Sequence, residues 1–388
     1  MSKGVLEGVK VLDLSRVLAG PYCGAFLADL GADVVKVEAP NGDDARHLGP
    51  FKGEESVYFA ELNHGKRSVV LNFKDPKDHE RFMKLVEHAD VVLENFRPGV
   101  TKRLGVDAES VHKTNPRIIY ASISGFGQEG PFRNRPAYDL IVQAMSGIMA
   151  ATGPEGGKPT RVGESLGDVV SGIFAGWAIC AALYERERTG VGRTVDVSMF
   201  NSLLALQVTN LSLLLADGKL PGRIGNCDPV SVPFDTYPAK DGLVALAVAN
   251  DRIWARLADL MGRPDLGAND AYLGDMNRAN KRQELTQLVS GWTQTMTVAE
   301  LLRKTEEAGV PAAPIWDLKE ALESEHVVAR HSLGHFTHPE LGKMPYLRFP
   351  ADFGCGNLEV SSESSPRLGE QTAGAVAAEW GRSANDDK

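Results

Sequence analysis

A glycine-flanked aspartate is the residue best placed to meet a bound molecule. Asp168 lies in the stretch VGESLGDVVSG, where Gly163 and Gly167 flank a short turn and an apolar run follows. This pattern predicts that Asp168 occupies the first turn of a buried helix, where unpaired backbone N–H groups and the positive end of the helix dipole meet a carboxylate. The glycines would let a ligand approach the backbone closely. A carboxylate open to a ligand and a plain helix N-cap aspartate both fit this spacing.

A basic turn follows one of the predicted strands. The segment Glu94-Asn-Phe-Arg-Pro-Gly99 ends a strand in a Pro-Gly turn, and Arg103 follows. Ligands of α/β proteins bind at the carboxyl ends of the strands, so Arg97 and Arg103 could hold a phosphate. Solvated arginines on an ordinary surface turn fit equally well. The glycine-rich loop Ser124-Gly-Phe-Gly127 follows the next strand, but such loops are common and indicate little alone.

Several other chemistries find no matching motif. The chain has no GxGxxG after its first strand, no GxxxxGK[ST] and no GxSxG, which disfavours dinucleotide binding, a P-loop and an α/β-type serine hydrolase. Its four cysteines lie far apart, as expected of free thiols in a reducing cytoplasm. No tight histidine spacing indicates a metal site. His331, His335 and His338 are close in sequence, and we expect them on a glycine-containing loop.

The composition argues against some partners. The 388 residues carry a formal net charge of −9, which disfavours nucleic acid binding, because phosphates are neutralised by clustered Lys and Arg. An anionic small ligand needs only a local cationic site. The amino terminus lacks the long apolar segment of a signal peptide, and no apolar run is long enough to indicate a membrane span. We therefore expect a cytoplasmic protein with no membrane partner.

Alternating strands and helices position these residues. A strand near Val9–Leu12, a helix from about Pro21 to Gly31 and a strand at Asp33–Glu38 form a βαβ unit, which indicates a parallel sheet. Residues 1 to about 215 therefore predict a doubly wound α/β core. Further strands are expected at 68–73, 89–95 and 118–124, and helices at 76–88, 137–151, 167–187 and 199–216.

Two regions depart from this pattern. Residues 40–67 contain several Gly, Pro and Asn turn signals, and we expect a long functional loop there. From about residue 225 the pattern changes to a smaller α+β arrangement, with a strand at Leu243–Ala249 and helices near 251–262, 278–294 and 298–308. Residues 335–355 return to turns and short strands.

Several separated motifs together resemble the class III coenzyme A (CoA) transferases, the family of formyl-CoA transferase and carnitine CoA-transferase. They occur in the family's order over nearly the whole chain, so the resemblance is specific. The resembling segments are Leu12-Asp-Leu-Ser-Arg-Val-Leu-Ala-Gly-Pro21, Leu30-Gly-Ala-Asp-Val-Val-Lys-Val-Glu38, Glu94–Gly99, Ser124-Gly-Phe-Gly-Gln-Glu-Gly-Pro131, Gly167-Asp168, Gly309-Val-Pro311 and Leu368-Gly-Glu370.

The resemblance implies an architecture. Family members have a large Rossmann-like domain built from both chain ends and a small middle domain, and two subunits interlock like links of a chain. By this analogy residues 1–215 and 330–380 form the large domain, residues 225–325 form a small α+β domain, and residues 381–388 are a disordered tail. The chain is then expected to be an interlocked homodimer, with residues 40–67 near the subunit boundary.

The resemblance also implies a covalent mechanism. Asp168 matches the family nucleophile, which attacks a thioester to form a mixed anhydride and then an aspartyl-CoA thioester. No metal and no permanently bound cofactor are implied, because the CoA thioester is itself the substrate. Tyr138 matches an active-site tyrosine. The implied CoA-binding residues are Val17, Leu18, Asn95, Phe96, Arg97, Arg103 and Tyr138.

Departures from formyl-CoA transferase bear on the substrate. Pro136 stands where that enzyme has a lysine, Ala39 stands where it has a basic residue, and its run of consecutive glycines is absent. The stretch Val230–Phe234 looks more like members that handle succinyl-CoA and larger dicarboxylates. We therefore expect succinyl-CoA as donor and a C4–C6 dicarboxylate such as itaconate, mesaconate, glutarate or hydroxymethylglutarate as acceptor, ahead of oxalate.

A dicarboxylate acceptor needs a cationic partner for its distal carboxylate, ideally a bidentate arginine. Arg46 and Arg67 lie in or beside the 40–67 segment, and we expect one of them, together with Tyr138, to bind the substrate. Arg16 and Arg161 stay open as alternatives.

Two other functions stay open. α-Methylacyl-CoA racemases have the same fold and use a His–Asp pair to move an α-proton. Their histidine falls where this chain has Tyr138, and a phenol is too weak a base at neutral pH for that reaction. A CoA-binding protein without chemistry is the second alternative, against which the presence of Asp168 argues.

Overall fold

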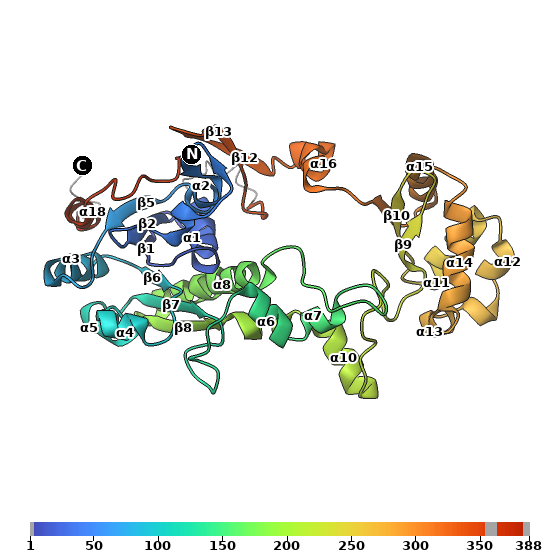
Figure 1. The fold of residues 1–388 in the computed structure, drawn as a ribbon, viewed down its shortest axis with the longest axis horizontal. Coiled ribbons are helices and arrows are strands. Elements are labelled where there is room, and N and C mark those ends of the chain that lie inside the picture. The colour runs from blue at the N-terminus through green and yellow to red at the C-terminus, as the bar shows by residue number, and fades with distance from the viewer. Residues whose placement is uncertain (1–3, 354–362, 383–388) are drawn as a thin grey trace. The chain divides into compact units, whose positions relative to one another are not determined.

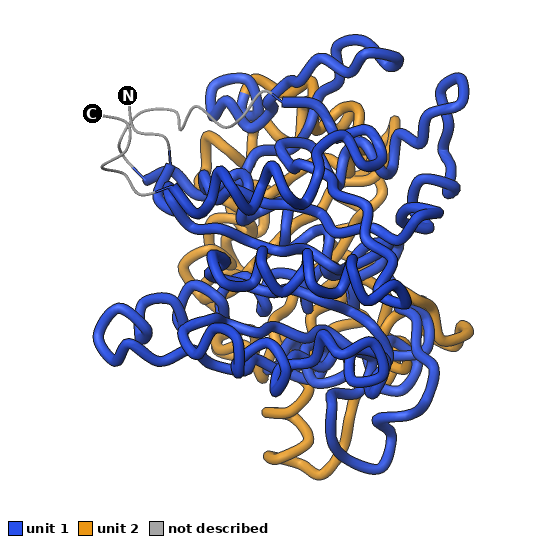
Figure 2. The backbone as a smooth tube through the Cα atoms, turned by 90° about the vertical axis from the view of Figure 1, so that its left-hand side faces the viewer, with its two compact units in different colours: residues 1–148, 162–209, 326–388 blue, residues 149–161, 210–325 orange. Residues whose placement is uncertain are grey.

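The computed structural model describes residues 4–353 and 363–382. These residues divide into two compact units, coloured separately in Figure 2. The first unit contains residues 1–148, 162–209 and 326–388, and the second contains residues 149–161 and 210–325. Segment 149–161 therefore belongs to the second unit, although its position in the sequence lies within the predicted α/β core. Cys355 and most of the predicted tail, residues 383–388, lie outside the described residues.

A six-stranded parallel sheet forms the centre of the first unit, which confirms the predicted mixed α/β fold with a parallel central sheet. The strand order is β5-β2-β1-β6-β7-β8, and the labels in Figure 1 follow this order from top to bottom. Successive strands are added toward one side of β1 up to β5 and toward its other side from β6 onward. The topological switch point therefore lies between the parallel strands β1 and β6, where ligands of doubly wound folds bind. The strands are β1 Lys10–Asp13, β2 Asp33–Glu38, β5 Arg67–Val70, β6 Val91–Glu94, β7 Ile119–Ser124 and β8 Arg193–Ser198.

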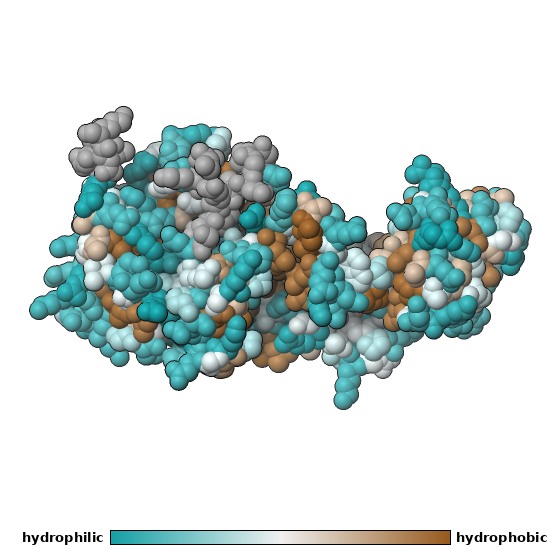
Figure 3. Space-filling view, turned by 90° about the horizontal axis from the view of Figure 1, so that it is seen from above, coloured by the Kyte–Doolittle hydropathy of each residue, from teal (hydrophilic) through white to brown (hydrophobic). Residues whose placement is uncertain are grey.

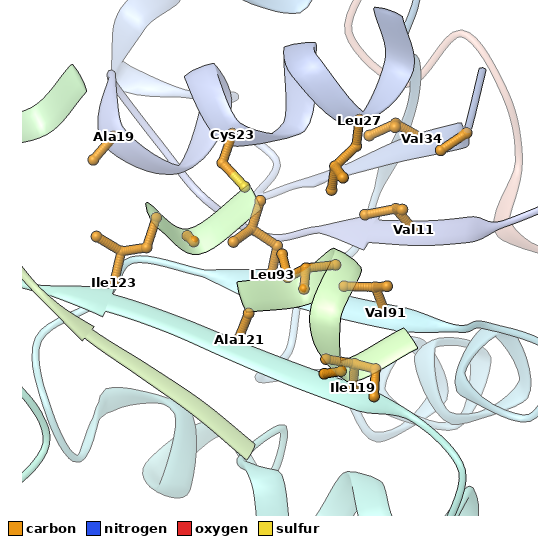
Figure 4. Packing of buried hydrophobic residues seen from close by; sticks show 14 of the residues in the cluster. Val11, Ala19, Cys23, Leu27, Val34, Val91, Leu93, Ile119, Ala121 and Ile123 are labelled. Atoms are coloured by element: carbon orange, nitrogen blue, oxygen red, sulfur yellow. The ribbon is translucent and has the colours of Figure 1, made fainter. Parts of the chain in front are cut away.

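Each face of this sheet has its own hydrophobic core, because neighbouring residues of a strand point to opposite faces. On one face Val11 and Leu93 meet Cys23 and Leu27 of helix α1, as Figure 4 shows. On the other face Leu12 belongs to a second cluster. Helices α1 Ala19–Asp29, α6 Asp139–Met145, α8 Leu166–Thr189 and α9 Met199–Ala205 contribute to the first core, and α3 Pro76–Val86, α5 Ala108–Thr114 and α18 Ala373–Trp380 contribute to the second.

The edge strand β8 was not predicted. Its outer residues Arg193 and Thr194 are exposed and it carries a charge at Asp196, so it lacks the apolar run of a central strand. The two long helices expected at 137–151 and 199–216 are each broken in two. Gly147, with φ of +92°, separates α6 from α7 Ile148–Ala151. Helix α9 similarly ends before α10 Val208–Asp217 begins.

The prediction of an irregular loop over residues 40–67 was wrong. This segment contains the short helix η1 Asp44–His47, the strands β3 Phe51–Lys52 and β4 Glu55–Ser56, and helix α2 Val57–Asn63. The Ser56 hydroxyl accepts a hydrogen bond from the Phe59 N–H, 3.1 Å away, and caps α2. Phe59, Ala60 and Leu62 of α2 are buried, so packing supports a helix that is too short to be stable alone.

The second unit is built on a small antiparallel sheet, ordered β11-β10-β9. Trp254, Tyr237 and Leu285 are fully buried in its core. Its main elements are β9 Phe234–Pro238, β10 Leu243–Ala247, β11 Ala312–Pro314, α11 Asp251–Leu260, α14 Arg282–Thr293 and α15 Val298–Ala308. Its shorter helices are α12 Pro264–Gly267, η2 Asp270–Tyr272, α13 Asp275–Ala279, α16 Leu318–Glu323 and, at the boundary between the units, α17 Glu325–Ala329.

The chain end returns to the first unit through the hairpin β12 Leu333–His338 and β13 Gly342–Leu347. His335 and His338 therefore lie on a strand, not on the loop that their spacing predicted. Phe336 and Tyr346 of this hairpin pack with Ala60 of α2. The two ends of the first unit are thereby joined by a small third core.

One described helix, α8, is long and apolar enough by length and composition to cross a membrane. Its Ala175, Ile179, Ala182 and Leu183 are buried in the first core of the sheet. Apolar side chains also reach the surface, as the brown areas in Figure 3 show.

Candidate active site

The beginning of α8 places Asp168 beside the beginning of α1. Asp168 and Gly172 lie four residues apart and share one face of α8. A Cβ atom at Gly172 would lie 2.7 Å from the backbone oxygen of Ala19, so only glycine permits this approach of the two helices. This contact brings the amino end of α8, which carries Asp168, close to the amino end of α1.

Gly167 allows an equally close contact on the opposite side of the turn. A Cβ atom there would lie 2.7 Å from Cγ2 of Val142 and 3.3 Å from Oδ1 of Asp139. The Gly167 N–H donates to Asp139 Oδ1 at 2.9 Å. The glycine beside Asp168 is therefore required for packing, and the expected opening for a ligand is not its main role.

Asp139 and Gln143 of α6 hold the turn before Asp168. The Gln143 amide donates to both oxygens of Asp139, at 3.0 and 2.8 Å, and to the Glu164 carbonyl at 3.2 Å. The Gln143 oxygen accepts from the Val162 N–H at 2.9 Å. Both side chains are buried, so this network gives the loop before α8 one defined conformation.

Asp168 differs sharply from Asp139. Asp139 accepts three hydrogen bonds, whereas no donor among the described residues reaches the carboxylate of Asp168. Burial, and secondly the charge of Asp139, raises the pKa of Asp168 to about 7. A carboxylate with a raised pKa and no internal partner is a better nucleophile than an ordinary one, and such groups are typical of active sites.

Tyr58 of α2 lies within electrostatic reach of Asp168. Burial, followed by the charges of Asp168 and Glu164, raises the pKa of Tyr58. Its hydroxyl therefore stays protonated and able to donate at neutral pH. Neither Tyr58 nor Asp139 was predicted as a site residue. Asp139 follows Tyr138 directly, which was the available signal, but Tyr58 gave none because its helix was not recognised.

The loop between β1 and α1 lies at the switch point of the sheet. Asn95, just after β6, donates to the Arg16 carbonyl at 2.8 Å and accepts from the Arg16 N–H at 2.8 Å. Val17, the next residue, has φ of +67°, which is strained for a β-branched side chain. Leu18 precedes α1 and its carbonyl accepts from Tyr22. The structure thus brings together Val17, Leu18 and Asn95, which were predicted from distant parts of the sequence.

The other predicted CoA-binding residues lie on the turn after β6. Phe96 is half-buried, and the Arg16 guanidinium lies 5.6 Å from its ring centre. Arg97 and Arg103 are exposed. Glu94 beneath them is buried, and burial raises its pKa to about 7. The turn therefore presents its positive charges to solvent at the carboxyl edge of the sheet.

The two arginines expected to bind the distal carboxylate are both held by protein carboxylates. Arg46 forms two hydrogen bonds with Glu38, at 2.8 and 2.7 Å, and lies over the ring of Phe59. Arg67 pairs with Asp33 at 2.5 Å and with Glu379 at 2.8 Å. It begins β5, so it lies at the amino edge of the sheet, away from Asp168. We do not retain Arg67 as a substrate-binding residue.

The remaining candidates differ in position. Arg16 is at the switch point, 3.3 Å from Asp44, and 45% of its side chain is exposed. Arg161 belongs to the second unit. Tyr138 precedes α6 and is 75% exposed, directly beside the buried Asp139.

Known proteins resemble this chain over most of its length. The model of CoA-transferase family III matches residues 6–372. An acetyl-CoA:oxalate CoA-transferase of Acetobacter aceti is 45% identical over 85% of this chain and 86% of its own length. A succinyl-CoA:mesaconate CoA-transferase of Haloarcula hispanica is 40% identical over 87% and 86%, respectively. A succinyl-CoA:glutarate CoA-transferase of Mus musculus is 38% identical over 95% and 84%.

Solved structures agree with this assignment. The crystal structure of a CAIB/BAIF family protein from Brucella suis has a TM-score of 0.85 and 36% identity, covering 98% of this chain and all of that chain. The match extends across the residues that form the site around Asp168. This chain belongs to CoA-transferase family III and is a class III CoA-transferase.

Proposed function

We propose that this enzyme transfers CoA from succinyl-CoA to a short dicarboxylic acid, with Asp168 as the covalent nucleophile. The observation that carries the proposal is the state of the Asp168 carboxylate. It is held by a rigid turn at the carboxyl edge of the sheet, has no internal donor among the described residues, and has a pKa of about 7. Both its protonated and its ionised form are therefore accessible near neutral pH.

The reaction balances without an external acid or base. An Asp168 oxygen attacks the thioester carbonyl, the carbon–sulfur bond breaks, and CoA leaves as thiolate while a mixed anhydride remains. The thiolate attacks the Asp168 carbonyl carbon and releases the donor acid, leaving an aspartyl-CoA thioester. The acceptor carboxylate then attacks this thioester, and the same two steps in reverse produce the new acyl-CoA and free Asp168.

The CoA-binding residues of this proposal lie at the switch point between β1 and β6. One side of this proposed CoA site is formed by Val17 and Leu18, and the other side is formed by Asn95 and Phe96. Arg97 and Arg103 are exposed beside them, where their guanidinium groups can meet phosphates. The amino end of α1 adds unpaired N–H groups that favour an anion.

The names of similar enzymes support a dicarboxylic acid as the acceptor. Enzymes named for mesaconate, glutarate and oxalate all match this chain, and each of these acids is a dicarboxylate. The expected low rank of oxalate has no support, since a relative named for oxalate is 45% identical. Arg16 is the candidate for the distal carboxylate, because it lies at the carboxyl edge and is partly exposed. Tyr138 is the exposed hydroxyl that would assist it.

We further propose that two copies form an interlocked homodimer. Helix α8 has a buried face and an opposite face that carries Ile173, Trp177 and Tyr184, which are 45%, 70% and 68% exposed. A row of large apolar side chains of this kind is typical of an interface. Light scattering should show a dimer, and Trp177→Asp should weaken it. A stable, active monomer would contradict the interlocked arrangement.

Trapping the intermediate tests the nucleophile. The enzyme is incubated with succinyl-CoA, hydroxylamine is added, and the peptides are mapped by mass spectrometry. A hydroxamate on Asp168, absent in Asp168→Asn, is expected; a hydroxamate on another carboxylate would contradict the assignment. A screen of acceptor acids against succinyl-CoA and acetyl-CoA tests the substrate class, and higher catalytic efficiency with monocarboxylates would overturn it.

A further inference from the structure

A buried ion pair lies directly behind the loop that precedes α1. Lys36 of β2 and Asp43 are 0% and 1% exposed, and their charged atoms lie 2.7 Å apart. Burial opposes the ionisation of Asp43, but the charge of Lys36 and the hydrogen bonds from Lys36, Ala45 and Val17 together hold the pKa of Asp43 below its ordinary value. Both groups are therefore charged at neutral pH.

Each member of the pair also holds a backbone group of that loop. The Lys36 ammonium donates to the Ser15 carbonyl at 2.9 Å. An Asp43 oxygen accepts from the N–H of Val17 at 3.0 Å. Arg16, between these two positions, is held on both backbone groups by Asn95. The backbone of residues 15–17 is thus held by the side chains of Lys36, Asp43 and Asn95.

These contacts explain the conformation of Val17. A left-handed backbone is unfavourable at a β-branched residue, and such strain persists only where surrounding contacts impose it. Without Asp43, the Val17 N–H would lose its partner and the residue would be free to relax to an extended conformation. The pair is itself anchored, since the Asp43 N–H donates to Glu38 at 3.0 Å.

We propose that the Lys36–Asp43 pair positions CoA by holding residues 15–18 in the conformation that binds it. This inference rests on the proposed CoA-binding role of Val17 and Leu18. Neither Lys36 nor Asp43 needs to touch the ligand, because both are buried behind the loop. They are positioning residues and should affect binding of the thioester more than its chemistry.

Three variants and a matched control test the proposal. Asp43→Ala removes the acceptor of the Val17 N–H, Asp43→Asn keeps an oxygen there without the charge, and Lys36→Met removes the donor to Ser15. The control is Asp90→Asn in the same unit, which disturbs an ion pair of 2.9 Å with the buried Arg186 at the amino edge of the sheet. All are compared by thermal unfolding, by kcat and KM for succinyl-CoA, and by calorimetric binding of CoA alone.

Asp43→Ala is expected to raise both KM for succinyl-CoA and Kd for CoA by about 10-fold or more, with kcat changed less than about 3-fold. Asp43→Asn and Lys36→Met should show a smaller rise, and the control should lose stability with KM and Kd within about 2-fold of wild type. If Asp43→Ala does not fold, Asp43→Asn carries the test, with faster hydrogen exchange expected in the peptide 14–22.

Two results would overturn the inference: an Asp43 variant that is destabilised like the control but binds CoA normally, or one that loses kcat with KM unchanged. The proposed function fails separately. A wild-type enzyme that binds CoA but transfers none would refute it, and CoA binding by the variants would still test the ion pair.

Discussion

At the amino edge of the central sheet, charged side chains neutralise one another, whereas at the carboxyl edge one is left without a partner. Arg67 is paired with Asp33 and Glu379 at the amino edge. At the carboxyl edge, the Asp168 carboxylate has no donor among the described residues, and Val17 is strained. Buried pairs occur at this edge too, but they hold backbone that would otherwise relax.

The difference shows where folding and function place opposite demands on the same kind of residue. A half-buried, unpaired carboxylate and a left-handed valine both lower stability. Their concentration at one edge indicates that this edge is shaped for a ligand, while the other edge is shaped for stability. Substitutions at the carboxyl edge should therefore mainly lower activity, whereas substitutions at the amino edge should mainly lower stability.

The largest effect is expected for Asp168→Asn. The amide cannot form the anhydride, so CoA transfer should fall by more than about 1,000-fold. The folded protein should be retained or made more stable at pH 8, because an unpaired, half-buried charge is removed. Rates with succinyl-CoA and thermal unfolding measure the two quantities. Residual transfer above one tenth of the wild-type rate would exclude Asp168 as the nucleophile.

Gly167→Ala should have the next largest effect. The added Cβ would lie 2.7 Å from Val142, so the beginning of α8 must shift. Overpacking of this kind costs about 1–3 kcal/mol, and a displaced Asp168 should lower kcat about 10- to 100-fold. Gly374→Ala in α18, where a Cβ meets no atom within 4 Å, is the matched control and should retain full activity. Equal rates for the two variants would contradict the packing argument.

A smaller effect concerns pH. Burial and the charge of Asp139 raise the pKa of Asp168 to about 7, and only the ionised form attacks, so kcat/KM should rise with pH and level off above about 7. Asp139→Asn removes the like charge but keeps an oxygen for the Gly167 N–H. The midpoint of the profile should move to lower pH, giving the variant a relatively higher activity at pH 6. A midpoint that does not move would show that burial alone sets this pKa.

The smallest effect on activity is expected at the amino edge. Arg67→Ala removes two partly exposed ion pairs and should lower the free energy of unfolding by about 1 kcal/mol, with kcat/KM within about 2-fold of wild type. Arg16→Ala at the carboxyl edge is the comparison, and its KM for the acceptor dicarboxylate should rise. A substantial loss of catalysis in Arg67→Ala would instead indicate that Arg67 binds the substrate.

Much of the first unit was predictable because its strands and helices carry periodic apolar residues. The segments around Val11, Val35, Val92 and Ile119 have apolar runs typical of buried parallel strands, and each became one. The edge strand β8 and helix α2 escaped prediction, because exposure on one side or short length removes that signal. The breaks near Gly147 and after α9 were also missed, since a single residue ends a helix without changing the apolar pattern around it.

The family, the parallel α/β core and Asp168 as the leading candidate for the nucleophile could all be inferred from the amino-acid sequence, because these depend on local patterns and motifs. Three further properties emerge only from the folded structure: Arg67 lies at the amino edge of the sheet, Asp139 is satisfied while Asp168 is not, and Lys36 and Asp43 hold Val17. These properties depend on which distant residues meet, since a charge, a pKa or a strained backbone is set by its neighbours in space. Spacing along the chain carries no information about those neighbours.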